Sequence, residues 1–353
     1  LTNTVTAGDI TASAGENATA VAGGINVKNG LVGSVTNTVT AGDITASAGE
    51  NATAVAGGIN VKNGLVGSVT NTVKADNITS KADGKKATAV AGGVNMKNAA
   101  ALGVANDVSA KGISSEATGD GATSVAGGIN MNNSGAFGVV NLVEAGGDIT
   151  SKAIGDGATS VAGGVNMQNA AAGIVGNLVG AGGDITSKAI GDGATSVAGG
   201  VNMQGTGSVI VGNLVGASGD ITSEATGAGT TSVAGGVNMK GDWDDPLSVT
   251  NEVNANGLIL SVADGVDATS VAGGINLDHT GNDVQLVSNT IQGANIASLA
   301  LAEGATSVAG GVNIQTPSGM LGPQTNTVNA SGNIIAVATG VDSESIVSGI
   351  NIE

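Results

Sequence analysis

The sequence predicts an all-β fold, a β-solenoid (parallel β-helix) of ten coils with about 34–38 residues in each coil. Two motifs that recur in phase predict the coils, and alternation of apolar and polar residues inside every copy predicts strands rather than helices. The motif Val-Ala-Gly-Gly-Ile/Val-Asn begins at Val21, Val55, Val90, Val125, Val161, Val197, Val233, Val271 and Val308, and a degenerate tenth copy begins at Ile346. The second motif, Asn-x-Val/Ile, begins at Asn3, Asn37, Asn71, Asn106, Asn141, Asn177, Asn213, Asn251, Asn289 and Asn326.

Each repeat is expected to form three short strands followed by an arc of variable length. In the second copy the expected strands are residues 35–39, 44–48 and 53–61, and the arc is residues 62–66. Gly, Asn and Asp residues separate the strands, as is typical of turns. The chain, residues 1–353, is therefore expected to be one repetitive domain, with coils that begin near residues 2, 36, 70, 105, 140, 176, 212, 250, 288 and 325.

The first strand of each repeat places an asparagine among core residues. Asn37 shares its parity with Val35 and Val39, so its side chain is expected to face inward. Stacked coils put equivalent residues about 4.8 Å apart, which lets inward amides hydrogen-bond along the axis. We therefore expect a buried amide ladder formed by the ten asparagines of the second motif.

The third strand is expected to present a face almost without side chains. Val125 and Met131 share one parity and are the larger residues, so they are expected inside. This assignment leaves Ala126, Gly128 and Asn130 outside. Another sheet could approach such a face closely, so we expect it to be covered.

Composition excludes several functional classes. The chain carries a net charge of −17 and no Arg, which argues against a nucleic-acid partner because phosphate binding depends on Lys and Arg. No run of 18 apolar residues exists, so no membrane span is expected. The absence of Cys is compatible with an extracellular or cell-surface location, since a solenoid needs no disulfides. Leu1 lies inside a repeat, so we expect that a leader was removed or that the chain belongs to something longer.

The densest acidic cluster lies in the variable arc of the seventh copy. There Asp242, Asp244 and Asp245 surround Trp243. Three carboxylates of this kind could form a weak Ca²⁺ site, or they could belong to a solvated loop. Paired carboxylates also carry glycoside hydrolysis, which is a third interpretation. Calcium is the one cofactor that the sequence suggests.

An aspartate also recurs at one turn position, at Asp9, Asp43, Asp148, Asp184 and Asp220. It is either a column that binds Ca²⁺ between coils or a residue selected for its turn propensity. His279 is the only histidine, and no Cys is present, so no nucleophile–base pair can be assembled from the sequence. We predict that the protein is not an enzyme.

The stacked Asn positions, the Gly-punctuated strands and the near-identical units resemble secreted β-solenoid surface proteins such as filamentous-haemagglutinin-type adhesins. Gly49-x-Asn51-x-Thr53-x-Val55 is also similar to the Gly/Asn-rich spacing of curlin fibre repeats, although the glutamine positions of that family are absent. The first resemblance covers the whole chain. It implies a fibrous protein of the cell surface or biofilm matrix.

These observations predict a structural subunit of an extracellular filament that assembles by end-to-end stacking. Asn326-x-Val328 of the last coil would then meet Asn3-x-Val5 of the next subunit. The expected partners are copies of the same chain, head to tail, and lateral contacts between fibres are a further mode. Such a contact does not close on itself, so it produces fibres.

Three other functions remain as alternatives. The first is a stalk or spacer of a surface adhesin. The second, ranked lower, is a polysaccharide-active β-helix enzyme, for which Trp243 and its aspartates are the only indication. The third, also ranked lower, is an ice-binding face on outward threonines such as Thr36 and Thr38, an array that stops at Val140 and Leu142.

Overall fold

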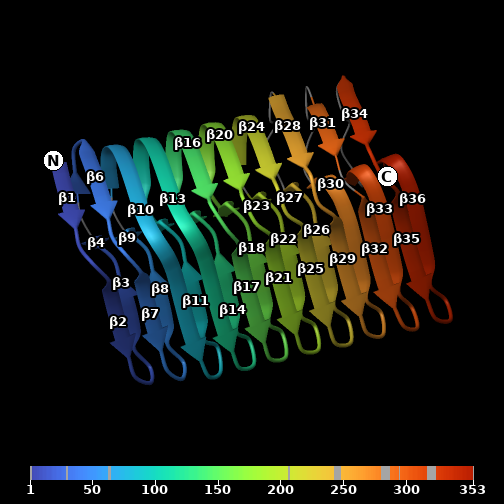
Figure 1. The fold of residues 1–353 in the computed structure, drawn as a ribbon, viewed down its shortest axis with the longest axis horizontal. Helices are drawn as coiled ribbons and strands as arrows, with labels where there is room; N and C mark the ends of the chain where they lie inside the picture. The colour runs from blue at the N-terminus through green and yellow to red at the C-terminus, as the bar shows by residue number, and fades with distance from the viewer. Residues whose placement is uncertain are drawn as a thin grey trace.

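The computed structural model describes residues 2–28, 31–62, 65–205, 207–241, 248–279, 287–293, 295–315 and 323–352. Every regular element in these ranges is a β-strand, and the chain winds into a parallel β-solenoid with its two ends at opposite ends of the stack (Figure 1). The predicted all-β solenoid is therefore confirmed. Ten asparagine-bearing strands pair in nine successive steps, so the chain makes about nine turns.

The first sheet has 19 strands and contains the first two strands of every coil. The first strands are β1 (Thr2–Thr6), β6 (Val35–Thr40), β16 (Gly135–Ala145), β20 (Ala171–Ala181), β24 (Gly207–Ala217), β28 (Ser248–Ala255), β31 (Val287–Gly293) and β34 (Gln324–Ala330), with the short β5 (Leu31–Val32) before β6. The second strands are β2 (Ile10–Ala14), β7 (Ile44–Ala48), β17 (Ile149–Ile154), β21 (Ile185–Ile190), β25 (Ile221–Thr226), β29 (Ile259–Asp264), β32 (Ile296–Leu301) and β35 (Ile334–Thr339).

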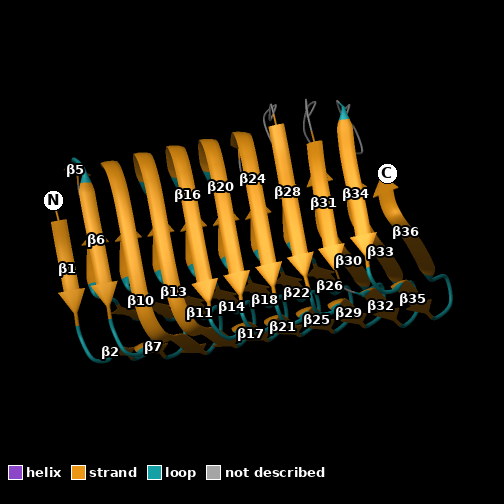
Figure 2. Ribbon diagram, turned by 45° about the horizontal axis from the view of Figure 1, so that its top comes forward, coloured by secondary structure: helices purple, strands orange, loops and turns teal. Residues whose placement is uncertain are grey.

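In the third and fourth coils these two strands are continuous, as β10 (Leu65–Asp83) and β13 (Ala100–Thr118). The Ala-Gly-Asp turn of the first two coils is replaced there by Ala75-Asp76-Asn77 and Ala110-Lys111-Gly112. Figure 2 shows these strands in the same row as the divided strands of neighbouring coils.

The second sheet has 17 strands. Its first segments are β3 (Thr19–Ala22), β8 (Thr53–Ala56), β11 (Thr88–Ala91), β14 (Thr123–Ala126), β18 (Thr159–Ala162), β22 (Thr195–Ala198) and β26 (Thr231–Ala234). Its second segments are β4 (Ile25–Lys28), β9 (Ile59–Lys62), β12 (Val94–Lys97), β15 (Ile129–Asn132), β19 (Val165–Gln168), β23 (Val201–Gln204) and β27 (Val237–Gly241). The last three coils join the two segments in β30 (Thr269–His279), β33 (Thr306–Gln315) and β36 (Glu344–Ile352).

The predicted third strand is therefore divided in most coils, and its parity assignment was wrong. Ala126 is fully buried, whereas Val125 is only half-buried and faces outward. The glycine pair that follows Ala126 leaves the pleat, so inward positions change from even to odd and Ile129 and Met131 are buried as expected. Gly128 also faces inward, where a Cβ would overlap the side chain of Val143. The expected face without side chains does not exist at these residues.

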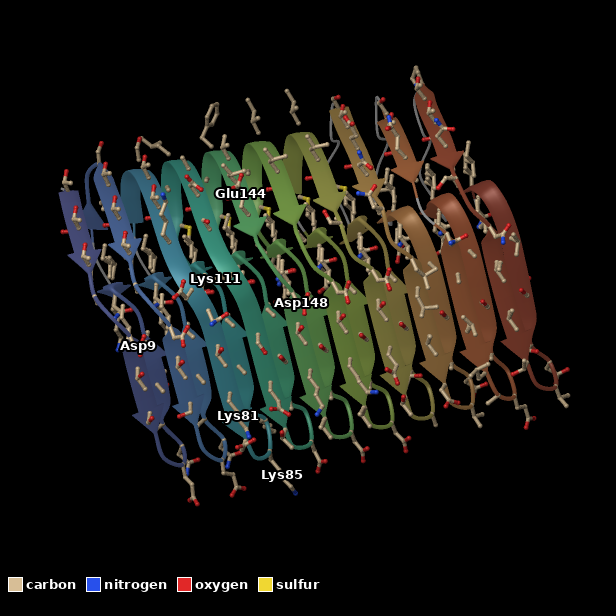
Figure 3. All side chains as sticks on the ribbon, in the orientation of Figure 1. Asp9, Lys81, Lys85, Lys111, Glu144 and Asp148 are labelled. Atoms are coloured by element: carbon tan, nitrogen blue, oxygen red, sulfur yellow. The ribbon has the colours of Figure 1, made fainter. Side chains whose placement is uncertain are left out.

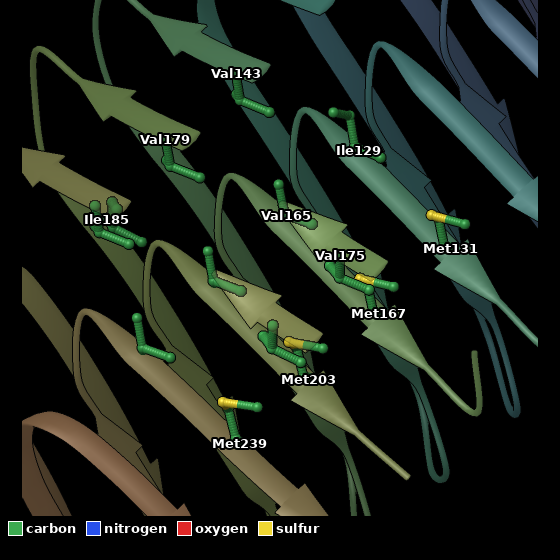
Figure 4. Packing of buried hydrophobic residues seen from close by; sticks show 14 of the residues in the cluster. Ile129, Met131, Val143, Val165, Met167, Val175, Val179, Ile185, Met203 and Met239 are labelled. Carbon is green, nitrogen blue, oxygen red and sulfur yellow. The ribbon is translucent and has the colours of Figure 1, made fainter. Parts of the chain in front are cut away.

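Columns of Val, Ile and Met fill the space between the sheets. Met131, Met167, Met203 and Met239 form one row along the axis, and Val143 and Val179 belong to another (Figure 4). Each of these residues is at most 2% exposed. Within the described residues, these aliphatic columns give a close-packed core without aromatic side chains.

Candidate functional site

The predicted asparagine ladder is present and unbroken through the first strands. Nδ2 of each asparagine donates to Oδ1 of the equivalent residue in the following coil, at 2.8–3.0 Å, from Asn3 to Asn326. The eight interior members are at most 3% exposed. Because every buried amide has a partner, the ladder fixes the register of the coils instead of destabilising the core.

A second asparagine ladder was not predicted. It joins Asn26, Asn60, Asn95, Asn130, Asn166, Asn202, Asn238, Asn276 and Asn313 at 2.8–3.0 Å. Its bonds point the opposite way, since each Nδ2 donates to Oδ1 of the preceding coil. Asn130 keeps the outer parity that alternation predicts, because Ile129 and Met131 on either side face inward. It is nevertheless only 8% exposed, since its Nδ2 also donates to the backbone oxygens of Ala91 and Gly127 at the bend. The recurrence of Asn in every Val-Ala-Gly-Gly motif was the signal that could have indicated this ladder.

A chain of serine hydroxyls, also not predicted, connects the two sheets inside the core. Its eleven members are Ser124, Ser151, Ser160, Ser187, Ser196, Ser223, Ser232, Ser261, Ser270, Ser298 and Ser307, all fully buried. Oγ–Oγ distances of 2.8–3.0 Å join them in a zigzag between second strands and the second sheet. We call this chain the serine zipper.

The two end coils open the core. Ile350 and Ile352 are 42% and 51% exposed, although their partners in the previous coil, Val312 and Ile314, are 0% and 2% exposed. At the other end Val5 is half-buried, whereas its partner Val39 is fully buried. Both edges also carry backbone groups that a further parallel strand could pair with.

Charge is distributed unevenly along the stack. Residues 1–120 hold eight of the 11 lysines and nine acidic residues. Residues 241–353 hold 12 acidic residues and no lysine. The C-terminal third is thus strongly negative, while the N-terminal third is almost neutral.

The outer face of the second sheet carries a regular array of threonine and valine. Its threonines are Thr19, Thr53, Thr88, Thr123, Thr159, Thr195, Thr231, Thr269 and Thr306, and a valine follows each of them two residues later. All of these side chains are exposed or half-buried, and they pair in register from coil to coil. We call them the Thr-x-Val array. It was not predicted because the parity assignment had placed these valines inside.

The recurring aspartates hold the backbone of the adjacent coil. Oδ1 of Asp9 accepts the backbone N–H of Asp43 at 3.0 Å, and the same bond joins Asp148 to Asp184. These bonds support the turn interpretation of the column; calcium between its coils stays a prediction. Figure 3 shows Asp9, Lys111 and Asp148 where the first and second strands meet. Asn77 and Gly112 take the place of the aspartate in the third and fourth coils. Beside them, the hydrogen bond of Lys111 to Asp76 raises the pKa of the lysine.

The remaining predicted site residues are the acidic cluster of the seventh copy and His279. Asp242, Asp244 and Asp245, with Trp243, lie outside the described residues. His279 ends β30, and the neighbouring Asp278 pairs with Lys240 at 3.1 Å. Within the described ranges, no three His, Asp or Glu side chains are grouped to hold a metal ion, and no helix is long and apolar enough to cross a membrane.

The fold defines the class of the protein as a parallel β-solenoid with two asparagine ladders. No family model, curated protein or solved structure matches the chain. The resemblance to adhesin and curlin repeats therefore stays a prediction.

Proposed function

We propose that the protein is a non-enzymatic structural subunit of an extracellular filament, assembled head to tail by stacking the last coil of one molecule on the first coil of the next. The observation that carries this proposal is the opening of the core at Ile350 and Ile352. A further coil would bury them as their partners are buried. Burial of a large aliphatic side chain contributes about 1.5–3 kcal/mol in full, so each partly exposed residue would add about 1 kcal/mol.

The polarity of the first ladder supports a head-to-tail joint. Asn326 ends the ladder with its Nδ2, which donates to Oε1 of Gln324 on its own strand at 3.3 Å. Asn3 begins the ladder, and its Nδ2 already donates to Asn37, which leaves Oδ1 as the group facing outward along the axis. A donor from Asn326 and an acceptor from Asn3 are complementary, whereas two first coils face to face would oppose two acceptors.

The charge distribution favours the same direction. Head-to-tail stacking places the acidic C-terminal third of one molecule next to the N-terminal third of another, which holds most of the lysines. Tail-to-tail contact would bring two segments with 12 acidic residues each together. Contacts between like charges are unfavourable within the Debye length, which is about 10 Å at 0.1 M salt.

The test is a pair of variants with equal charge. Ile350→Asp with Ile352→Asp puts carboxylates on the open core, while Thr325→Asp with Thr327→Asp puts them on the outer face of the same coil. Electron microscopy should show filaments for the wild-type chain and the outer-face variant, and short rods for the core variant. Circular dichroism should show unchanged β content in all three.

Two results would contradict the proposal. One is filaments of normal length from the core variant. The other is a wild-type chain that stays a single rod at high concentration, which would favour the stalk of a surface adhesin instead.

A second candidate function, ice binding, is favoured by the Thr-x-Val array. Threonine and valine are kept in nine coils, although the outward residues of the first strands differ from coil to coil. The array is uncharged, with spacings of about 4.8 Å between coils and about 6.6 Å within a strand. A lattice of methyl and hydroxyl groups can order the first water layer, which is what attachment to ice requires.

Thermal hysteresis tests this second function. A gap between melting and freezing points should appear, and Thr159→Lys with Thr195→Lys should remove it. The matched control, Thr150→Lys with Thr186→Lys, changes half-buried threonines on the other sheet and should keep the gap. The absence of any gap in the unchanged protein rules ice binding out.

A further inference from the structure

The first strands of the central coils expose an unusual number of large apolar side chains, most of them at outward positions of the strand register. They are Leu102 (72% exposed), Phe137 (75%), Val140 (62%), Ile174 (50%), Leu178 (43%), Ile210 (41%) and Leu214 (41%). All seven belong to β13, β16, β20 and β24, and we call them the leucine face. Contiguous apolar patches of this kind on a soluble protein indicate an interaction surface.

The strand register turns this face into alternating ridges and troughs. Leu178 and Leu214 stack in one column, and Gly176 and Gly212 stack in the column two residues before it. A Cβ added to either glycine would meet no atom within 4 Å, so this trough is open. In the fifth coil the order is reversed, because Gly138 pairs with Ile174 and Val140 pairs with Gly176. A half-turn about an axis along the strands therefore sets Val140 of one copy against the Gly176 trough of the other, as in interdigitated sheets.

Few charges lie on the face, and its exposed acidic residues are Asp107 on β13 and Glu144 on β16. Neither β20 nor β24 contains a charged residue, although the whole chain carries −17. On the first-strand surface, Lys74 lies in the third coil and Glu252 in the eighth. The leucine face occupies the fourth to seventh coils, so its midpoint is also the midpoint of the ten-coil stack.

We infer that the leucine face binds the leucine face of a second copy of this chain, with the two solenoids side by side and antiparallel. A two-fold axis through the midpoint of the face aligns the full length of both molecules. It places Lys74 of each copy opposite the coil of Glu252 in the other, and the lysine-bearing third of each opposite the acidic third. A parallel arrangement would instead align the two acidic thirds.

The available area is sufficient for a stable dimer. Strands of 11 residues over four coils span about 36 by 19 Å. The two partners together would then bury about 1,400 Å², which lies within the range of about 1,200–2,000 Å² for specific complexes. This lateral contact uses a different surface from the end-to-end joint, so it does not depend on the proposed filament.

The test uses the chain with Ile350→Asp and Ile352→Asp, in which end-to-end growth is blocked. Sedimentation equilibrium should give twice the chain mass of 33.1 kDa. Leu178→Lys with Leu214→Lys should raise the dissociation constant at least about 100-fold, because it places charge at the centre of the interface. Each added lysine reduces the net negative charge of the chain, so stronger repulsion between the two molecules cannot explain the loss of the dimer. The control, Thr38→Lys with Thr72→Lys, changes the same column outside the face and should keep the dimer.

Orientation is tested by disulfide formation, since the chain has no Cys. A mixture of the single variants Lys74→Cys and Glu252→Cys should form mixed disulfide dimers, and each variant alone should form few. A monomer at about 100 µM with the face intact overturns the inference, as does a dimer that resists the leucine substitutions. Strong cross-linking of either variant with itself overturns the antiparallel arrangement.

Discussion

The first coils and the central coils share the same backbone path, but they differ in the residues at the contact between the sheets and on the outer face of the first sheet. Residues 2–35 and 36–69 are identical, and alanines such as Ala46 and Ala54 fill the contact between their sheets. In the central coils serines such as Ser187 and Ser196 fill the equivalent contact. The outer face changes from Thr36 and Thr38 to glycine and leucine.

The comparison shows that equivalent residues stacked from coil to coil act together as columns, and that the fold is built from these columns and not from single residues. Both asparagine ladders and the inward Val and Ile columns continue through both regions, so register and core are fixed in common. The sheet contact and the outer face then vary independently. Stability should thus be shared along the stack, while recognition is local to particular coils.

The largest expected effect comes from breaking what both regions share. Asn177→Leu leaves Nδ2 of Asn141 without an acceptor and Oδ1 of Asn213 without a donor. Two buried unpaired groups at about 1–3 kcal/mol each should lower the free energy of unfolding by about 2–5 kcal/mol. Asn71→Leu should lower it equally in the first coils. Guanidinium unfolding measures both, and a large difference between them would show that the ladder is not equivalent in the two regions.

The next feature that both regions share is the glycine pair at which the strands of the second sheet bend. Gly58→Ala and Gly164→Ala each place a methyl group against an inward valine, Val73 or Val179. Overpacking of this kind costs about 1–3 kcal/mol, so both variants should melt earlier. Gly176→Ala is the matched control, because its methyl group points into open space. Equal melting temperatures for all three would exclude close packing at the bend.

The smallest effect sharpens the difference between the regions. Ser196→Ala removes the acceptor of Ser223 and the donor to Ser187, so it should lower the unfolding free energy by about 1–2 kcal/mol. Ala54→Ser adds a hydroxyl where Ser80 can donate to it, and should change stability by less than about 1 kcal/mol. Equal losses from the two substitutions would mean that the zipper is only a space-filling equivalent of alanine.

Repetition made the fold predictable, and breaks in the pleat limited the prediction. The first strand, with Asn37 between Val35 and Val39, alternates without interruption, so its inward residues follow from parity. The third strand crosses two glycines, where parity changes, and this hid the outward Val125 and the inward Ala126. Asn130 keeps its outer parity, and alternation gives no sign that the bend buries its side chain. The serine zipper could not be recognised because Ser is as compatible with an outer position as with an inner one. Alternation within single strands does not indicate which hydroxyl groups of the two sheets face each other.

The most direct test of the filament is the axial structure of assembled material, obtained by fibre diffraction and cryo-electron microscopy. Head-to-tail stacking predicts a meridional reflection near 4.8 Å, coil density that continues through the subunit junctions, and a subunit repeat of about 48 Å for ten coils. Discrete rods of one subunit length, or filaments with a gap in the coil density between subunits, would contradict stacking of the last coil on the first.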